Sequence, residues 1–184
     1  MTVRERAPET VKERPGGARV ARLTGRWQNA TDTERLLQVI QPALIGLIDG
    51  TISTLAPIFA MAYAFGSKAA LLAGLAAAFG AAISMGASEG LSDDGKLTGR
   101  GSSLARALIT GGATFVGGTA HALPFLIDDV GQALAVAYVV VAVELVVIAF
   151  VRKRYLHVSL TGSLIQVTII GALVAGVGVW VGHA

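Results

Sequence analysis

The sequence predicts an all-α, polytopic membrane protein, and three observations support this fold class. Hydrophobic residues make up 53% of the 184 residues and charged residues only 15%, well below the ~25% of an ordinary soluble domain. The 23 glycines suit close helix packing in lipid. Five long apolar segments follow a polar N-terminal segment. So little charge cannot coat a soluble domain, which excludes a soluble enzyme and a mostly disordered chain.

The chain divides into a basic segment, residues 1–41, and a membrane domain, residues 42–184. The first segment holds eight Lys/Arg and five acidic residues and has no apolar run, so it is not a cleavable signal peptide. Its first part, through Gly17, is predicted to be disordered. Residues 31–41 are predicted to form a short interfacial helix, with Thr31 or Asp32 as its cap.

The membrane domain contains five apolar segments, each long enough to cross ~30 Å of hydrocarbon with ~20 residues. Because backbone hydrogen bonds cannot stay open in lipid, each segment is expected to be a helix. Pro57 removes the hydrogen bond to the carbonyl of Ser53 and predicts a kink in the first helix. The expected helices cover 42–66, 68–92, 104–127, 130–151 and 159–182.

The distribution of Lys and Arg predicts the orientation. Eight lie in residues 1–41, three in 93–106 and three in 152–154, whereas Lys68 alone lies on the other side. Positive charge concentrates in the cytoplasm, so each protomer is expected to have a cytoplasmic N-terminus and an external C-terminus. We expect an integral protein of the bacterial inner membrane. The topology accounts for the basic residues, so no nucleic-acid partner is expected.

Small residues recur every four positions on three of the expected helices. Such stripes allow close backbone contact, either within one chain or between two copies in a homodimer. The pair Gly46 and Gly50 lies beside Asp49, which favours an ion pathway along a dimer interface. The stripes are Gly46 and Gly50; Gly74, Ala78, Ala82, Gly86 and Gly90; and Gly178 and Gly182.

Three carboxylates within the expected spans, Asp49, Glu89 and Glu144, each cost at least ~2–3 kcal/mol in a bilayer. With a rise of ~1.5 Å per residue, Asp49, Glu144, Met85 and Gln166 lie ~10 Å inside the inner boundary. Glu89 lies one turn below Met85. Carboxylate, amide and thioether ligands favour a transition metal such as Fe²⁺ over Mg²⁺. In the alternative, Met85 fills a gap in the core and Gln166 joins two helices.

Other polar residues are candidates for an additional metal ligand, for the cytoplasmic entry of the cation path and for its exit. Ser53 lies on the face of Asp49, and the carbonyl freed by Pro57 is a usable ligand. Asp93 and Asp94 at the cytoplasmic mouth either attract cations or form a turn that Gly95 completes. His121, followed by Asp128 and Asp129, either forms an exit or proton path or bonds a neighbouring helix.

Gly86 to Gly90 matches the G-x-S-x-G motif of serine hydrolases, with Ser88 in the nucleophile position. That motif needs a turn between strand and helix, whereas this stretch lies within an expected helix. An intramembrane serine protease would have to pair Ser88 with His121, roughly 20 Å away along the membrane normal. We therefore expect no enzymatic activity.

The stretches around Asp49 (46–50) and Met85 (83–89), with Gly117 to Pro124, resemble the vacuolar iron transporter family over residues 42–184. Residues 50–59, 91–97 and 143–145 resemble most closely its bacterial branch of membrane-bound ferritins. The resemblance implies a dimer of five-helix protomers that moves Fe²⁺, and often Mn²⁺, out of the cytosol in exchange for protons, with no tightly bound cofactor. It also implies that Asp49 is the essential acid, Met85 the methionine ligand and Glu89 the nearby acid.

Three departures from the family are visible. Residues 1–41 contain no histidine, so the ferritin-like domain with its Glu-x-x-His motifs is not expected. The connection between the second and third helices is short and lacks the glutamate-rich extension of plant members. Ala77 stands where many relatives carry a polar residue. The resulting expectation is a bare transport domain; the alternative is a membrane metal sensor or scaffold that transports nothing.

Overall fold

A computed structural model describes residues 32–184, which contain helices and loops and no strand. Contacts divide the chain into two units, Met1–Thr33 and Glu34–Ala184, and the second contains nearly all of the described helices. The disorder expected through Gly17 and the cap expected at Thr31 lie outside the described residues.

The helical elements follow the predicted order with two changes of boundary. The helix predicted over residues 31–41 is present and leads without a break into the first membrane helix. The α-helix of the third predicted segment ends at Ala120 instead of residue 127. The α-helix of the fourth continues to Leu156 instead of ending at residue 151. The elements are α2 (Asp32–Arg35), η1 (Leu36–Ile40), α3 (Gln41–Ser53), α4 (Leu55–Phe65), α5 (Ser67–Ser92), α6 (Ser103–Ala120), η2 (Leu123–Leu126), α7 (Val130–Leu156) and α8 (Leu160–Gly182).

The first membrane helix is interrupted where the proline predicts it. Helix α3 ends at Ser53, Thr54 takes φ −87° and ψ −13°, and α4 begins at Leu55. Pro57 has no amide hydrogen, so the Ser53 carbonyl loses its partner, and regular bonding resumes with Ile58 N to Thr54 O at 3.1 Å. The break places the Thr54 side chain at the junction of α3 and α4.

Four helical stretches are long and apolar enough to cross a membrane, as expected of an integral membrane protein. The fifth predicted span, α6, is not among them. Nine of its 18 residues are Gly, Ser, Thr or Arg, which explains its lower hydropathy. The four stretches are Asp32–Phe65, Ser67–Ser92, Val130–Leu156 and Leu160–His183.

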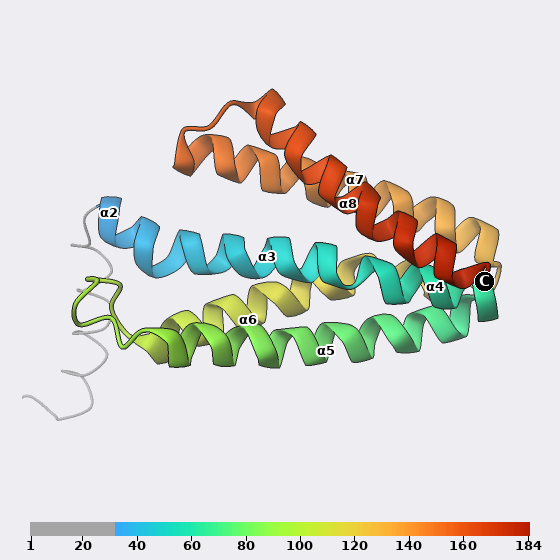
Figure 1. The fold of residues 1–184 in the computed structure, drawn as a ribbon, viewed down its shortest axis with the longest axis horizontal. Helices are drawn as coiled ribbons and strands as arrows, with labels where there is room; N and C mark the ends of the chain where they lie inside the picture. The colour runs from blue at the N-terminus through green and yellow to red at the C-terminus, as the bar shows by residue number, and fades with distance from the viewer. Residues whose placement is uncertain (1–31) are drawn as a thin grey trace, which may run out of the picture. The chain divides into compact units, whose positions relative to one another are not determined.

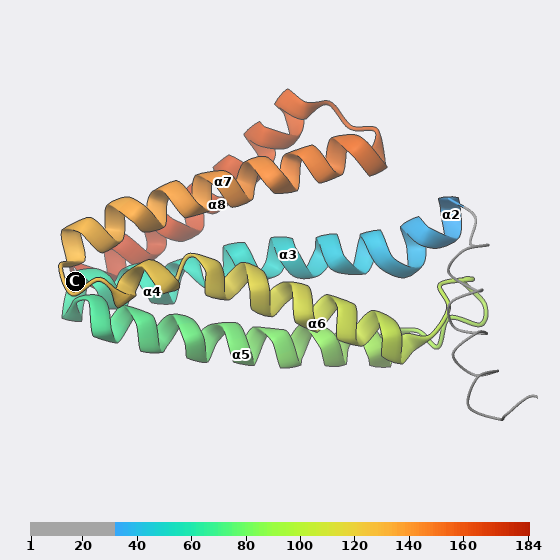
Figure 2. The ribbon, with the colours of Figure 1, turned by 180° about the vertical axis from the view of Figure 1, so that it is seen from behind.

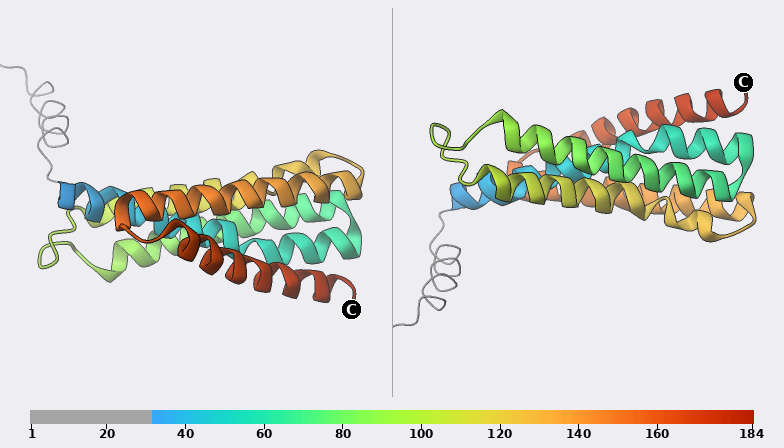
Figure 3. Two further views of the ribbon diagram at one scale, coloured as in Figure 1. Left: turned by 90° about the horizontal axis from the view of Figure 1, so that it is seen from above. Right: turned by 90° about the horizontal axis from the view of Figure 1, so that it is seen from below.

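Helix α6 nevertheless runs beside the apolar helices. It packs along both α3 and α5, while α4 packs against α5 and α8, and α8 also contacts α7 (Figures 1 and 2). Within the unit Glu34–Ala184, the α5–α6 loop lies at one end of the bundle and the C-terminus at the other (Figure 3). The polar face of α6, with Arg106, Thr110 and Thr114, is fully buried.

The glycine stripes serve packing within the chain. A Cβ atom on Gly46 or Gly50 would collide with the carbonyl oxygen of Thr110 or Thr114 on α6, and one on Gly178 would lie 2.5 Å from Ala56 O on α4. The idea that Gly46 and Gly50 favour a dimer interface therefore needs correction, because both glycines are buried against α6. Close backbone approach inside one protomer explains this spacing.

Gly46→Ala is expected to destabilise the bundle by about 1–3 kcal/mol, the usual effect of overpacking. The added methyl group collides with the Thr110 carbonyl, so α3 and α6 must separate. Gly80→Ala is the matched control, because its Cβ meets nothing within 4 Å and alanine is a better helix former. Thermal unfolding in detergent should give a lower midpoint for Gly46→Ala alone, and equal midpoints would contradict the packing.

Candidate functional site

Asp49 and Met85, predicted to lie together, line one groove between α3 and α5. The groove has a volume of about 360 Å³. Asp49 and Ser53 are one turn apart on the same face of α3, and Met85 faces them from α5. Within residues 32–184, Asp49 has no hydrogen bond or ion pair. The lining residues are Ile45, Ile48, Asp49, Ile52, Ser53 and Met85.

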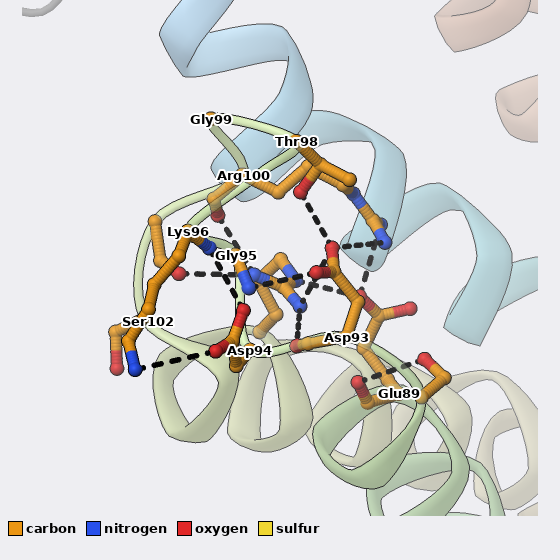
Figure 4. Close-up of polar contacts among 12 residues, drawn as sticks. Glu89, Asp93, Asp94, Gly95, Lys96, Thr98, Gly99, Arg100 and Ser102 are labelled. Atoms are coloured by element: carbon orange, nitrogen blue, oxygen red, sulfur yellow. Dashed lines mark hydrogen bonds and ion pairs between the residues drawn. The ribbon is translucent and has the colours of Figure 1, made fainter.

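Glu89 does not extend this groove, although it lies one turn from Met85. Its Oε1 atom lies 2.7 Å from Arg106 Nε and 2.9 Å from Arg100 Nη2. These two guanidinium groups neutralise the carboxylate at the end of α5, and Figure 4 shows the side chain of Arg100 reaching that of Glu89. The structure thus gives Glu89 a role in holding the α5–α6 loop instead of placing it beside Asp49.

Arg106 organises this loop and was not singled out in the sequence. Its guanidinium is fully buried. Besides Glu89, it donates to the carbonyls of Asp93 at 2.6 Å, Arg100 at 2.9 Å and Gly101 at 3.1 Å. The planar fork of arginine suits several acceptors at once. One feature of the sequence could have predicted this: Arg106 and Thr110 are four residues apart, so they lie on the same face of one helix.

Asp93 is tied into the same loop, so its carboxylate is not free at the mouth. Its Oδ1 accepts from Gly95 N at 2.7 Å, and its Oδ2 accepts from the Thr98 hydroxyl at 2.7 Å. Gly95 has φ 77°, the turn geometry that glycine favours. The turn alternative is therefore confirmed for Asp93. Asp94 is exposed and pairs with Lys96 at 3.4 Å.

Thr98→Val is expected to raise the pKa of Asp93. The Thr98 hydroxyl, then the Gly95 amide, then Arg106 and Arg100 hold this pKa below its ordinary value. A lowered pKa means that the loop gains stability from Asp93 above the ordinary pKa and loses it as pH falls through the lowered pKa. Carboxyl ¹³C NMR titration measures the change. Thr98→Ser keeps the hydroxyl and should leave the titration unchanged; equal titration in Thr98→Val would contradict the assignment.

A second polar cluster lies where α6 ends against α7 and the α3–α4 break. His121 Nε2 lies 2.8 Å from Thr54 Oγ1, and His121 Nδ1 lies 2.8 Å from Glu144 Oε2. Thr54 and His121 are fully buried, and the Glu144 side chain is 11% exposed. His121 thus bonds neighbouring helices, which was the alternative to an exit path.

The expected grouping of Glu144 with Asp49 and Met85 is not found. The depth estimate placed the end of α7 at residue 151, whereas the helix continues to Leu156, so Glu144 lies near its middle. Gln166 is also elsewhere, since its Oε1 accepts from Arg152 Nη2 at 2.9 Å. Glu144 and Gln166 therefore do not lie in the groove of Asp49 and Met85.

The predicted exit residues, Asp128 and Asp129, do not share a hydrogen-bond partner with His121 among residues 32–184. Asp129 caps α7, accepting from Gln132 N at 2.7 Å, and Asp128 is exposed. Both lie between η2 and α7, outside the cluster of His121 and Glu144. Their helix-capping role accounts for Asp129 without a cation path.

The bonds from Thr54 through His121 to Glu144 follow the order of a hydrolase triad. The Thr54 hydroxyl is fully buried and bonds Gly50 O at 2.8 Å, so a substrate does not reach it. Ser88 lies within α5, away from the turn that its motif requires. Both ring nitrogens of His121 are already engaged, which leaves none for Ser88.

Within residues 32–184, no three His, Cys, Asp or Glu side chains gather closely enough to hold a metal ion. Asp49 and Met85 are thus one carboxylate and one thioether in a shared groove. Comparison of the chain with protein-family profiles, curated proteins and solved structures gives no match. The chemistry of the site is therefore argued from its own residues.

Proposed function

We propose that the chain exports Fe²⁺, or Mn²⁺, from the cytosol in exchange for protons across a bacterial inner membrane. The observation that carries this proposal is the groove in which the unpaired carboxylate of Asp49 lies with the thioether of Met85. A carboxylate without a partner is costly in a membrane and usually marks an ion path. The resemblance of these motifs to the vacuolar iron transporter family supports the same function.

The proposed site is completed by a second copy of the chain. One carboxylate and one thioether are too few ligands for a divalent transition metal, which takes four to six donors in proteins. Two copies facing each other at this groove supply two of each. Ile45, on the rim, is 42% exposed, which leaves this face of α3 available to a partner.

The charge of the described residues supports five spans with a cytoplasmic N-terminus. The start of α3, the α5–α6 loop and the α7–α8 loop lie at one end of the unit Glu34–Ala184 (Figure 2). That end carries seven of its cationic residues, and the other carries Lys68 alone, the asymmetry that orients membrane proteins. The seven are Arg35, Lys96, Arg100, Arg106, Arg152, Lys153 and Arg154.

Exchange of metal for protons follows from the chemistry of Asp49. A carboxylate binds either a metal ion or a proton, so protons from outside displace the metal and metal from the cytosol displaces the protons. The soft sulfur of Met85 favours Fe²⁺ over the abundant Mg²⁺ and Ca²⁺. The Asp49 groove therefore supplies selectivity for the metal and a carboxylate from which protons displace it.

The test is Fe²⁺ flux into proteoliposomes that hold the full chain, with and without a pH gradient. The expected result is flux that the gradient accelerates, accompanied by proton movement in the opposite direction. Binding of Fe²⁺ by a folded dimer without any flux would contradict transport and favour the metal-sensor or scaffold alternative. Empty liposomes and Mg²⁺ serve as controls.

A further inference from the structure

The hydrogen bonds around Thr54 fix which nitrogen of His121 carries hydrogen. Thr54 Oγ1 lies 2.8 Å from Gly50 O and 2.8 Å from His121 Nε2. A carbonyl oxygen only accepts, so the hydroxyl hydrogen points to Gly50. The hydroxyl oxygen then accepts from His121, which requires hydrogen on Nε2.

The remaining contact of the imidazole then requires a further proton. His121 Nδ1 lies 2.8 Å from Glu144 Oε2, and a hydrogen bond there needs one hydrogen between the two atoms. With Nε2 protonated, the pair is either imidazolium with carboxylate or neutral imidazole with carboxylic acid. Both forms hold the same added proton and have no net charge, which suits a buried site.

We propose that His121 and Glu144 form a buried proton-binding site whose occupancy controls the Thr54 hydroxyl at the end of α3. The inference deepens the proposed exchange of metal for protons, on which it rests. It gives the protons a site of their own beside the helix that carries Asp49. Neither member is one of the proposed metal ligands, Asp49 and Met85.

Loss of the proton changes the bonding of Thr54. The N–H bond at Nε2 breaks and its proton goes to water, which leaves the single imidazole hydrogen on Nδ1, where it bonds the Glu144 carboxylate. Nε2 then becomes an acceptor, and the Thr54 hydroxyl turns from Gly50 O to His121. In a regular α-helix the Thr54 amide would bond the Gly50 carbonyl, but here it bonds Ile52 O. When the Thr54 hydroxyl turns away, the Gly50 carbonyl, one residue from Asp49, therefore loses its hydroxyl partner.

Few other charges act on this pair. Glu144 is the charged group in contact with His121 among residues 32–184. Asp49 of α3 lines the separate groove, and the charged groups of α5 lie at its ends, Lys68 in the first turn and Glu89 in the last. On α7, Tyr138 bonds Tyr63 and Arg152 bonds Gln166; on α6, Arg106 bonds Glu89.

The first test is ¹⁵N NMR of the full chain in lipid bilayers, labelled at its three histidines. As the pH is raised stepwise, His121 should lose one proton and its Nε2 should change from protonated to unprotonated. Thr54→Val should lose the protonated Nε2 signal at the acid end, and Thr54→Ser should restore it. An Nε2 that stays unprotonated over the whole range would overturn the proposal.

The second test measures how strongly a pH gradient accelerates Fe²⁺ flux in the variant Glu144→Gln. The glutamine amide donates to Nδ1 and keeps the bond pattern of the loaded pair, but it releases no proton. The variant should bind Fe²⁺ as the wild type does and lose the acceleration of flux by the pH gradient. His183→Gln, a change near the exposed C-terminus, should keep it.

The two tests separate the proton site from transport itself. Continued gradient-driven flux in Glu144→Gln would overturn the proton site while leaving metal export intact. The NMR transition in a wild type without any flux would support the proton site and contradict export.

Discussion

Asp49→Ala is expected to abolish Fe²⁺ flux while leaving the helical bundle folded. Asp49 is the one charged residue that lines the groove, and its carboxylate has no hydrogen bond or ion pair among residues 32–184. Loss of about 1.4 kcal/mol of binding free energy alone lowers affinity tenfold, and a charged ligand contributes at least that. Flux assays in proteoliposomes measure the loss.

Stability distinguishes this functional loss from unfolding. An unpaired carboxylate costs at least ~2–3 kcal/mol in the bilayer, so Asp49→Ala should unfold at the same or a higher temperature than the wild type. Asp94→Asn, on the exposed loop, is the matched acid control and should keep flux. Normal flux in Asp49→Ala would remove the proposed site.

Met85→Leu extends the same prediction to the thioether. Leucine keeps the volume of methionine and removes the sulfur ligand, so Fe²⁺ affinity should fall with little change in stability. Met61→Leu is the matched control, because Met61 packs against the hydrophobic core away from the groove. Equal affinities for both variants would mean that Met85 fills space.

Arg106→Gln should have the largest effect on stability, about 3–5 kcal/mol, as for other broken buried ion pairs. It leaves Glu89, whose side chain is 10% exposed, with Arg100 alone, and it removes the donors to three loop carbonyls. Thermal unfolding and hydrogen exchange of residues 93–102 measure the result.

Two variants sharpen this test. Arg106→Lys should rescue little, because a single ammonium cannot reach the acceptors that the planar fork bonds. Lys96→Gln breaks an exposed pair, with side chains 85% and 62% exposed, and should change stability by no more than about 1 kcal/mol. A folded, protected loop in Arg106→Gln would show that backbone turns alone hold it.

The sequence predicted those features that local patterns determine. Apolar length gave the order of the helices, and the missing amide of Pro57 gave the break at Thr54. Asp49 and Met85 share a groove as expected, and the end of α5 from which the depth of Met85 is counted lies at Ser92 as predicted.

Features that depend on tertiary partners were not predictable in this way. The depth of Glu144 depended on the end of α7, where basic residues continue the helix past the apolar run to Leu156. Arg106 looked like one more cytoplasmic charge, since its acceptors are carbonyls that the loop brings together only on folding. The spacing of Gly46 predicted a close helix contact, but it did not show that the partner is α6.

The buried polar face of α6 has a consequence for how the chain is inserted during synthesis. By itself α6 is a poor substrate for the translocon, because half of its residues are Gly, Ser, Thr or Arg and it is not among the described helices that are apolar enough to cross a membrane. The partners of Arg106 lie at the end of α5 and in the loop just before α6. The Glu89 ion pair is therefore complete only once α5, its loop and the start of α6 have all been synthesised, and a nascent chain released before Arg106 leaves Glu89 without its closest partner.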